Sequence, residues 1–456
     1  MSRKNTLNRR QFLTSAAVAG AAVTMGAGST LLTSCSGGKA AKKQAIKRLK
    51  KWRIPTLTDM AIDGKAVKVG LVGCGGQGTG DIISLTQAAN GIEIVALGDV
   101  FKDRVDGSRE RIKKETGQEI AADKCFVGFD AYQKVIDSGV DLVLLVTPPI
   151  FRPLHFETAV KAGKHVFMEK PVSADVAGSL KILATAKMAE SQGLSIVTGT
   201  QRRHQRSYVE AFKQIADGAI GEIVGGEVYW NQSMLWYRNR EAGWSDMEWM
   251  IRDWVNWTWL SGDHIVEQHV HNIDVFNWFA GLNPVSATGF GARQRRLTGD
   301  QYDMFSVDFV YENGIHMHSM CRQIDGCTDN VSEVVQGIHG SWTSVGGSQI
   351  KDLAGNVIWK WDYDQEKQNF KQTNPYVLQF VDLITAIRSN KPVNEAADTA
   401  NSSLIAVMGR ESAYTGQTVS WEQIKGTNMN MLPENPVLGP MDMSKYIVPI
   451  PGKEKE

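Results

Sequence analysis

The feature that most constrains the fold is an apolar run that leads into a cluster of glycines, Val67-Lys68-Val69-Gly70-Leu71-Val72-Gly73-Cys74-Gly75-Gly76-Gln77-Gly78. Glycines in the pattern G-x-G-x-x-G after a strand allow a tight turn, close backbone approach to a pyrophosphate, and close packing of the next helix. The N–H groups at that helix's start attract the anion. We therefore expect Gly73, Gly75, Gln77 and Gly78 to contact a dinucleotide, with an ordinary glycine-rich turn as the alternative.

A second apolar run, residues 92–97, ends at Gly98-Asp99. An acid about 20 residues beyond the last glycine is the group that binds the ribose 2′-hydroxyl in NAD sites. Asp99 therefore favours NAD as the cofactor, while the nearby Lys102 and Arg104 leave NADP possible.

Short Val/Ile/Leu runs alternate with amphipathic stretches from residue 67 to 200, which is typical of βαβ units around a parallel sheet. Alternating runs at 304–310 and 315–320 predict strands of a largely antiparallel sheet. The sequence thus predicts an α/β protein with a dinucleotide-binding domain at 61–199. An α+β domain with an open sheet follows at 200–426, for substrate binding and oligomerisation, and a C-terminal arm occupies 427–456.

The first 35 residues have the features of an export signal. Asn8-Arg9-Arg10-Gln11-Phe12-Leu13 resembles the twin-arginine pattern, and the apolar stretch ends in Leu32-Thr33-Ser34-Cys35, which resembles a lipoprotein cleavage site. Thr, Ser and Gly interrupt that stretch, which argues against a membrane-spanning helix. We therefore expect a periplasmic protein anchored to a membrane through lipidated Cys35.

A basic segment follows, with eight Lys or Arg and no acid between residues 36 and 53. We assign 36–60 to a tether, which either contacts anionic head groups or is simply solvated. With four further basic residues in the signal, the rest of the chain keeps 38 basic and 49 acidic residues, a net charge of −11. This acidic body argues against a nucleic-acid partner.

The five cysteines show no metal-like spacing. Besides Cys35, they leave room for at most one disulfide, with Cys321 and Cys327 as the candidate pair in an oxidising compartment.

A family resemblance rests on the glycine loop, the strand end Thr147-Pro148, His155 in the next helix, and Ala162-Gly163-Lys164-His165-Val166-Phe167-Met168-Glu169-Lys170-Pro171. These segments resemble the glucose-fructose oxidoreductase and inositol 2-dehydrogenase family, called Gfo/Idh/MocA, over residues 67–420. The resemblance implies a Rossmann domain that binds NAD(P), and a homo-oligomer, dimer or tetramer. It also implies cofactor contacts from Thr147, Pro148, His155, Glu169 and Lys170, although two extra residues separate Pro148 from His155.

Lys170 lies at the carboxyl end of a predicted parallel strand, where open α/β sheets bind ligands. There it could donate a hydrogen bond to a reacting oxygen. Residues 261–278 read as one helix with Glu267, His271, Asp274 and Trp278 along one stripe. The resemblance implies that His271 is the general base and that Glu267 either touches substrate or orients the imidazole. A metal site and an ordinary buried polar helix are the alternatives, and we expect no metal.

Eight of the thirteen tryptophans lie between residues 230 and 278. Aromatic faces suit the C–H surfaces of sugars, although core packing is the more common role for each one. We take Trp254, Arg252 and Asp274 as substrate contacts, and expect Arg203 and His204 at the mouth of the site.

Three functions fit this sequence. The first is an exported NAD(P)-dependent oxidoreductase that acts on a sugar, polyol or glycoside carbinol, with a tightly held and recycled cofactor. The second is an NAD-dependent glycoside hydrolase that works through transient sugar oxidation and elimination. The third is a non-catalytic lipoprotein that binds a sugar or a dinucleotide, since a fold alone does not establish an activity.

Overall fold

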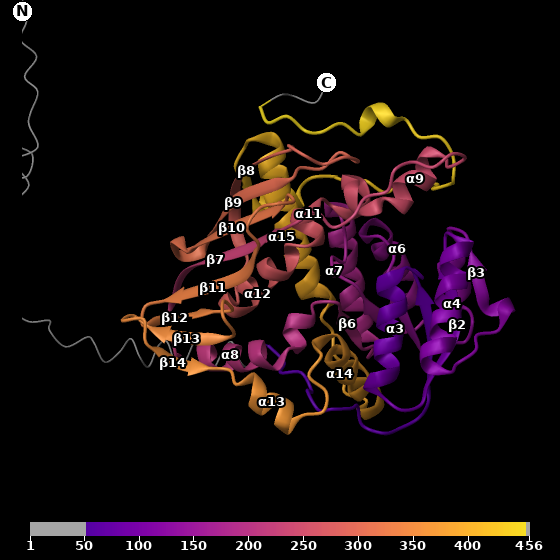
Figure 1. Ribbon diagram of the computed structural model, residues 1–456, viewed down its shortest axis with the longest axis horizontal. Coiled ribbons are helices and arrows are strands. Elements are labelled where there is room, and N and C mark those ends of the chain that lie inside the picture. The colour runs from indigo at the N-terminus through magenta and orange to yellow at the C-terminus, as the bar shows by residue number, and fades with distance from the viewer. Residues whose placement is uncertain (1–51, 453–456) are drawn as a thin grey trace, which may run out of the picture.

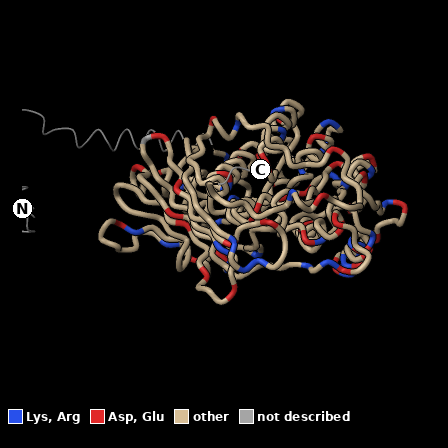
Figure 2. Tube along the Cα trace, turned by 90° about the horizontal axis from the view of Figure 1, so that it is seen from above, with Lys and Arg blue, Asp and Glu red and all other residues tan. Residues whose placement is uncertain are grey.

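The structure is a computed structural model that describes residues 52–452 (Figure 1). The predicted signal with Cys35, and the tether up to residue 51, lie outside the described residues. Among the described helices, none is long and apolar enough to cross a membrane. Lys and Arg are interspersed with Asp and Glu over the described chain (Figure 2).

The first sheet is parallel, with six strands in the order β3-β2-β1-β4-β5-β6. Its strands are β1 (Val67–Val72), β2 (Ile92–Asp99), β3 (Cys125–Val127), β4 (Leu142–Leu145), β5 (His165–Met168) and β6 (Ile196–Thr198). β4 is buried along its whole length, as expected for a strand covered on both faces. The order reverses between β1 and β4, so a crevice for ligands is expected at their carboxyl ends.

Helices cover both faces of this sheet, as the predicted βαβ pattern requires. They are α3 (Gly76–Ala88), α4 (Lys102–Thr116), α5 (Ala131–Ile136), α6 (Arg152–Lys161) and α7 (Val176–Ser191). The predicted α/β class is confirmed. α3 begins at Gly76, inside the glycine cluster, and not at Asp81 as the sequence suggested.

The second sheet has nine strands in the order β14-β13-β12-β11-β7-β10-β9-β8-β15. β7 (Ile223–Gln232) pairs in parallel with β10 (His316–Gln323), and the other pairs are antiparallel. The remaining strands are β8 (Pro284–Ala292), β9 (Met304–Tyr311), β11 (Asn330–Gly337), β12 (Gly340–Thr343), β13 (Gln349–Asp352), β14 (Val357–Lys360) and β15 (Val419–Ser420). The prediction of a largely antiparallel sheet is therefore confirmed.

The helices of the second half are α8 (Arg206–Ala216), α9 (Asp246–Arg252), α10 (Thr258–Ser261), α11 (His264–Glu267), α12 (Val270–Ala280), α13 (Tyr363–Asn369), α14 (Pro375–Ser389), α15 (Ala396–Thr415) and α16 (Trp421–Lys425). α12 and α15 pack on one face of the second sheet (Figure 1). Alternate residues of β10, among them His316 and His318, are exposed on the other face.

The predicted boundary at 199/200 separates the two sheets but not the two cores. α14 packs against α3, and its residues Leu378, Phe380 and Ile384 are buried in the core of the first sheet. Sequence order alone placed α14 in the second domain, although its apolar face completes the first.

Residues 52–60, which the predicted tether 36–60 includes, pack on the globule. Arg53 forms an ion pair with buried Asp382, and Ile54 and Leu57 pack against the core of the second sheet. Residues 52–60 therefore belong to the folded body.

The candidate disulfide is not formed. Cys321 is buried on β10 and Cys327 is exposed, and both are free thiols.

Candidate active site

The main cavity has a volume of about 590 Å³ and opens at the carboxyl ends of β1, β2 and β4. Its wall includes most of the cofactor residues predicted from sequence, namely Gly73, Gly75, Gln77, Gly78, Asp99, Thr147, Pro148 and His155. Of the predicted cofactor set, Glu169 and Lys170 do not line this cavity.

The glycine loop fits a dinucleotide for three separate reasons. Gly73 has a φ of +98°, and a Cβ there would lie 2.6 Å from the carbonyl of Val146. A Cβ on Gly78 would lie 2.0 Å from the carbonyl oxygen of Gly73, so only glycine allows α3 to pack this closely. At Gly75 and Gly76 nothing lies within 4 Å, which leaves the backbone at the start of α3 open to an anion.

Asp99 is the last residue of β2, and hydrogen bonds hold its carboxyl against the glycine loop. Its Oδ2 accepts a hydrogen bond from the backbone N of Cys74 at 2.8 Å, and its Oδ1 accepts one from Phe101 N at 3.0 Å. Burial raises the pKa of this carboxyl, and the two backbone N–H groups oppose that rise. Its fixed position in the cavity wall suits a carboxylate that accepts ribose hydroxyls.

His155 lies in the cavity wall despite the two extra residues before it. Its Nδ1 lies 3.3 Å from the hydroxyl of Thr147, and its ring stacks on Tyr132 with centroids 4.2 Å apart. Burial lowers the pKa of His155 to about 3, so the imidazole is neutral.

Lys170 is positioned by a buried arginine that the sequence did not reveal. The Arg152 guanidinium donates hydrogen bonds to the carbonyl oxygens of Thr147 (2.7 Å), Glu169 (2.9 Å) and Pro171. It thereby joins the loops that follow β4 and β5. Burial lowers the pKa of Arg152 to about 10, which still leaves it charged at neutral pH.

Lys170 reaches across to the second half of the chain. Its Nζ donates to the backbone oxygen of Glu267 at 2.7 Å and to Glu267 Oε1 at 3.0 Å. The carboxylate of Glu267 therefore pairs with Lys170 and also accepts from Gln268, and among the described residues it has no hydrogen bond to His271. Glu267 accordingly holds the lysine in this structure, and its role towards substrate or imidazole stays a prediction.

The segment 261–278 is broken, where one helix was predicted. α10 ends at Ser261 and is capped by Gly262, α11 begins after Asp263, whose φ is +73°, and α12 begins at Val270. Asp263 accepts from the backbone N and Nδ1 of His264, so it fixes the start of α11.

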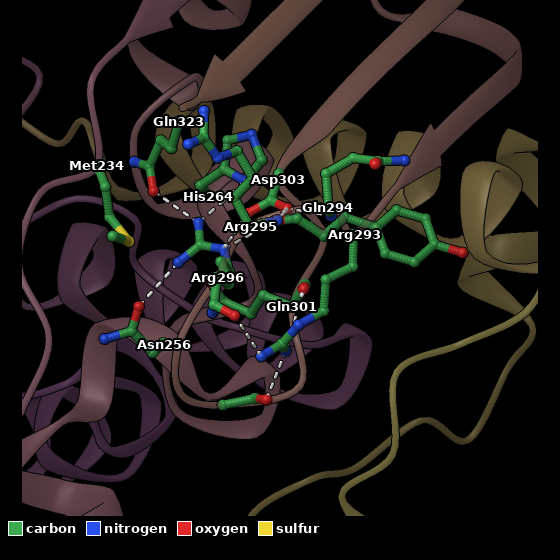
Figure 3. A network of polar contacts seen from close by, with 12 residues as sticks. Met234, Asn256, His264, Arg293, Gln294, Arg295, Arg296, Gln301, Asp303 and Gln323 are labelled. Atoms are coloured by element: carbon green, nitrogen blue, oxygen red, sulfur yellow. Dashed lines mark hydrogen bonds and ion pairs between the residues drawn. The ribbon is translucent and has the colours of Figure 1, made fainter. Parts of the chain in front are cut away.

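A buried arginine network supports this break (Figure 3). The Arg296 guanidinium donates to Asn256 Oδ1 (2.8 Å), Gln323 Oε1 (2.6 Å) and the carbonyl of Tyr302 (2.8 Å). These contacts join the loop 293–303 to β10 and to the turn before α10. Arg296 Nη2 also lies 3.4 Å from Nδ1 of His264, so the network contacts the first residue of the short helix that carries Glu267.

His271 lies in the first turn of α12 and is 5% exposed. Its ring stacks on Trp230 with centroids 5.5 Å apart, and its buried Nδ1 has no partner among the described residues. Burial, and secondarily the charge of Lys170, lower the pKa of His271 well below 6.5. The imidazole is therefore neutral at neutral pH, which is the form that a general base requires.

The predicted substrate residues Arg203 and Asp274 are bound to each other. Arg203 donates from Nε and Nη2 to the two Asp274 oxygens at 2.8 and 2.9 Å, and Ser402 donates to Asp274 as well. Such a buried bidentate pair uses the groups that would bind sugar hydroxyls. We correct both assignments: this pair joins the start of the second half to α12.

His204 is also structural and does not lie at the mouth of the site. Its fully buried Nε2 lies 3.2 Å from Glu395 and 3.4 Å from Asp382. These three residues have the spacing of a metal site. However, Arg53 already pairs with Asp382, and a protonated His204 supplies the second positive charge.

His204 should make stability depend on pH. Although burial opposes its charge, Glu395 and Asp382 raise the pKa of His204 to about 9. A folded-state pKa above the unfolded value of about 6.5 means that stability is full below pH 6.5 and falls towards pH 9, by on the order of 3 kcal/mol. We expect urea unfolding to show this loss in the wild type and not in His204→Gln. An equal loss in the variant would contradict the assignment.

Arg252 and Trp254 both line the main cavity. Arg252 donates to both oxygens of Asp103 at 3.1 Å, to Glu248 at 2.9 Å, and lies 3.8 Å over the ring of Phe101. Arg252 thus links α9 to α4 beside Asp99, and its contact with substrate stays a prediction. Trp254 meets Trp236 edge to face, and both rings remain available in the wall.

Sequence reasoning missed several residues of the cavity wall, notably Arg238 and the C-terminal residues Leu432, Pro433, Glu434 and Pro436. No local motif marks them, because each reaches the cavity only through the tertiary fold. Of the remaining tryptophans, Trp257 and Trp259 are core residues.

Comparison with known proteins identifies the class. The family model described as "Oxidoreductase family, NAD-binding Rossmann fold" matches residues 67–197, and the "GFO/IDH/MocA C-terminal domain" matches residues 208–343. Together these models cover more than half of the chain, and the protein belongs to the Gfo/Idh/MocA oxidoreductase family. Its first domain is an NAD-binding Rossmann domain, as predicted.

Individual relatives are more distant. An inositol 2-dehydrogenase of Saccharopolyspora erythraea is 31% identical over 158 residues, 35% of this chain and 44% of that protein. A glycosyl hydrolase family 109 protein of Shewanella pealeana is 23% identical over 82% of each chain. For three of the inositol dehydrogenases that this chain matches, the matched segments span 44–64% of their length. The scyllo-inositol dehydrogenase of Lactobacillus casei, solved with NAD(H) and scyllo-inositol, has a TM-score of 0.58 at 20% identity, covering 78% of this chain and 99% of that one. This last likeness supports the fold.

Proposed function

We propose that the protein is an exported NAD(P)-dependent oxidoreductase that moves a hydride between a nicotinamide and a carbinol of a sugar, polyol or glycoside. The observation that carries this proposal is the pairing of Lys170 with Glu267 on α11, the short helix directly before α12. The lysine follows a strand of the dinucleotide-binding sheet, and its charge lowers the pKa of His271 on the other half of the chain.

The two side chains divide the chemistry. A nicotinamide dinucleotide held by the glycine loop and Asp99 would supply the hydride acceptor or donor. Lys170 donates a hydrogen bond to the substrate oxygen, and neutral His271 removes the hydroxyl proton as the carbon gives up its hydride. In the reverse direction the imidazolium returns that proton. Asp99 and the glycine loop hold the ribose and pyrophosphate.

A second candidate is an NAD-dependent glycoside hydrolase, which the likeness to the Shewanella pealeana family 109 protein over 82% of both chains favours. In such a hydrolase, oxidation at one sugar carbon makes a neighbouring C–H acidic. Loss of that proton expels the aglycone, water adds to the double bond, and the hydride returns to the sugar. The segment Glu169-Lys170-Pro171 and His271 serve the redox steps of either reaction.

One assay separates the two candidates. Purified enzyme is incubated with a nitrophenyl glycoside without added NAD. The hydrolase predicts continuous nitrophenol release with no net change at 340 nm, the absorbance of reduced nicotinamide. The dehydrogenase predicts no nitrophenol release. It predicts instead a change in absorbance at 340 nm when a suitable free sugar or polyol is added. If no nitrophenol is released and the absorbance at 340 nm does not change with any sugar or polyol tested, the result favours a non-catalytic binding protein.

An exported enzyme meets little free NAD, so we further propose that the cofactor stays bound and is recycled by a second substrate. Denaturing the purified protein and identifying the released nucleotide tests this directly. The membrane anchor through Cys35 is a separate proposal, tested by mass spectrometry of the mature N-terminus.

A further inference from the structure

The C-terminal arm, defined here as residues 427–452, contributes to the wall of the main cavity. Leu432, Pro433, Glu434 and Pro436 line the same space as the glycine loop and Asp99. Figure 1 shows the arm passing to the side of α9 and returning over the top of the molecule. A cavity predicted from the first domain alone therefore has a wall from the far end of the chain.

Before the cavity, the arm is bound to the start of α7. The backbone N of Ala177 donates to the carbonyl of Met429 at 3.0 Å, and Met431 N donates to Asp175 Oδ2 at 2.6 Å. Asp175 is buried, and its other oxygen caps α7 through Gly178 N. This attachment is part of the first domain.

Beyond the cavity, the arm is bound to α9. Met247 N donates to the carbonyl of Gly439 at 3.1 Å, and Met441 N donates to Asp246 Oδ2 at 3.0 Å. α9 is itself tied to α4 by Arg252 and Asp103. The segment 432–436, which lines the cavity, therefore forms a bridge that is hydrogen-bonded to the protein on either side.

Apolar contacts hold the bridge down. Met431, Leu432, Met441, Met443 and Tyr446 pack against a buried cluster that includes Phe101, Phe151 and Trp259. Tyr446 lies edge to face against Trp257 at 6.0 Å. Phe101 follows the proposed ribose-binding Asp99 by two residues, so this cluster lies beside the dinucleotide site.

We infer that the arm is a component of the dinucleotide site and retains the bound dinucleotide between turnovers. This inference rests on the proposed function, because it assumes that the main cavity takes NAD. Residues 432–436 lie between two hydrogen-bonded attachments, so a ligand enclosed by them leaves only after an attachment opens. The dissociation rate then follows the opening of the arm and not only the ligand's own contacts.

Exchange of bound nucleotide tests the inference without any turnover. Protein loaded with radiolabelled NAD⁺ is chased with excess unlabelled NAD⁺, and retained label is followed by rapid gel filtration. Three chains are compared with the wild type: a truncation after Ile424, Asp246→Ala, which removes the acceptor for Met441 N, and Arg240→Ala. Arg240 pairs with the other oxygen of Asp246, so its loss leaves the arm's attachment intact.

We expect exchange to be about tenfold or more faster in Asp246→Ala and faster still in the truncation, with Arg240→Ala near the wild type. Circular dichroism and thermal unfolding show whether each chain is folded; if the truncation is not, Asp246→Ala decides. Wild-type exchange rates in folded Asp246→Ala and truncated protein would overturn the role of the arm while leaving the proposed function intact. A wild type that binds no NAD⁺ would instead overturn the proposed function, and the inference with it.

Discussion

His271→Ala is expected to lower kcat by about 100- to 10,000-fold while the protein keeps its nucleotide, because the variant loses the group that accepts the substrate proton. His271 is separate from the glycine loop and Asp99, so the content of bound nucleotide should match that of the wild type. Single-turnover measurements at 340 nm with a sugar substrate read the chemical step. Wild-type turnover in folded His271→Ala would remove His271 from the mechanism.

The pH profile provides an independent check on the same residue. A base is active in its neutral form, and the folded structure holds the pKa of His271 well below 6.5. The acid limb of kcat/KM for the wild type should therefore lie below pH 6.5, and activity should stay level from pH 6.5 to neutrality. His271→Gln is the shape-matched control, and its residual activity should show no such limb.

Short-range features of this protein could be predicted from the sequence. The glycine loop, Asp99 and the strand ends at Thr147 and Lys170 each depend on a few consecutive residues and on the geometry of a parallel sheet. The structure brings all of these to one edge of the first sheet. The resemblance of Glu267 and His271 to family positions predicted that both belong to the same site as Lys170. The single helix predicted to carry them is broken into α11 and α12.

Features that depend on distant pairing could not be predicted. Arg203 and His204 follow the last strand of the first sheet, where a site mouth was a reasonable expectation. Their partners are Asp274 on α12, Asp382 on α14 and Glu395 just before α15. Both cations are buried only because these later helices fold back against the segment that carries them. The break before α11 did have a local signal in the sequence, because glycine commonly ends a helix in the left-handed conformation, and Gly262 caps α10 in this way.

The role of Lys170 can be decided by separating chemistry from cofactor binding. Lys170→Met keeps much of the side chain's length and removes its charge and donors. If Lys170 stabilises charge on the substrate oxygen, kcat should fall by about 100- to 1,000-fold while nucleotide content is unchanged. If its main task is to hold the nicotinamide, the variant should lose nucleotide during purification.

Glu267→Gln is the matched control, because it removes the partner's charge and keeps the lysine. The backbone oxygen of Glu267 still accepts from Lys170 Nζ in this variant, so the lysine stays in place and the loss of kcat should be much smaller than in Lys170→Met. Lys170→Met also leaves the carboxylate of Glu267, which is 7% exposed, without its counter-ion. Some loss of stability is therefore expected, and unfolding should be measured beside kcat. Equal losses of kcat in the two folded variants would show that the charge pair, and not the lysine's donor, supports the reaction.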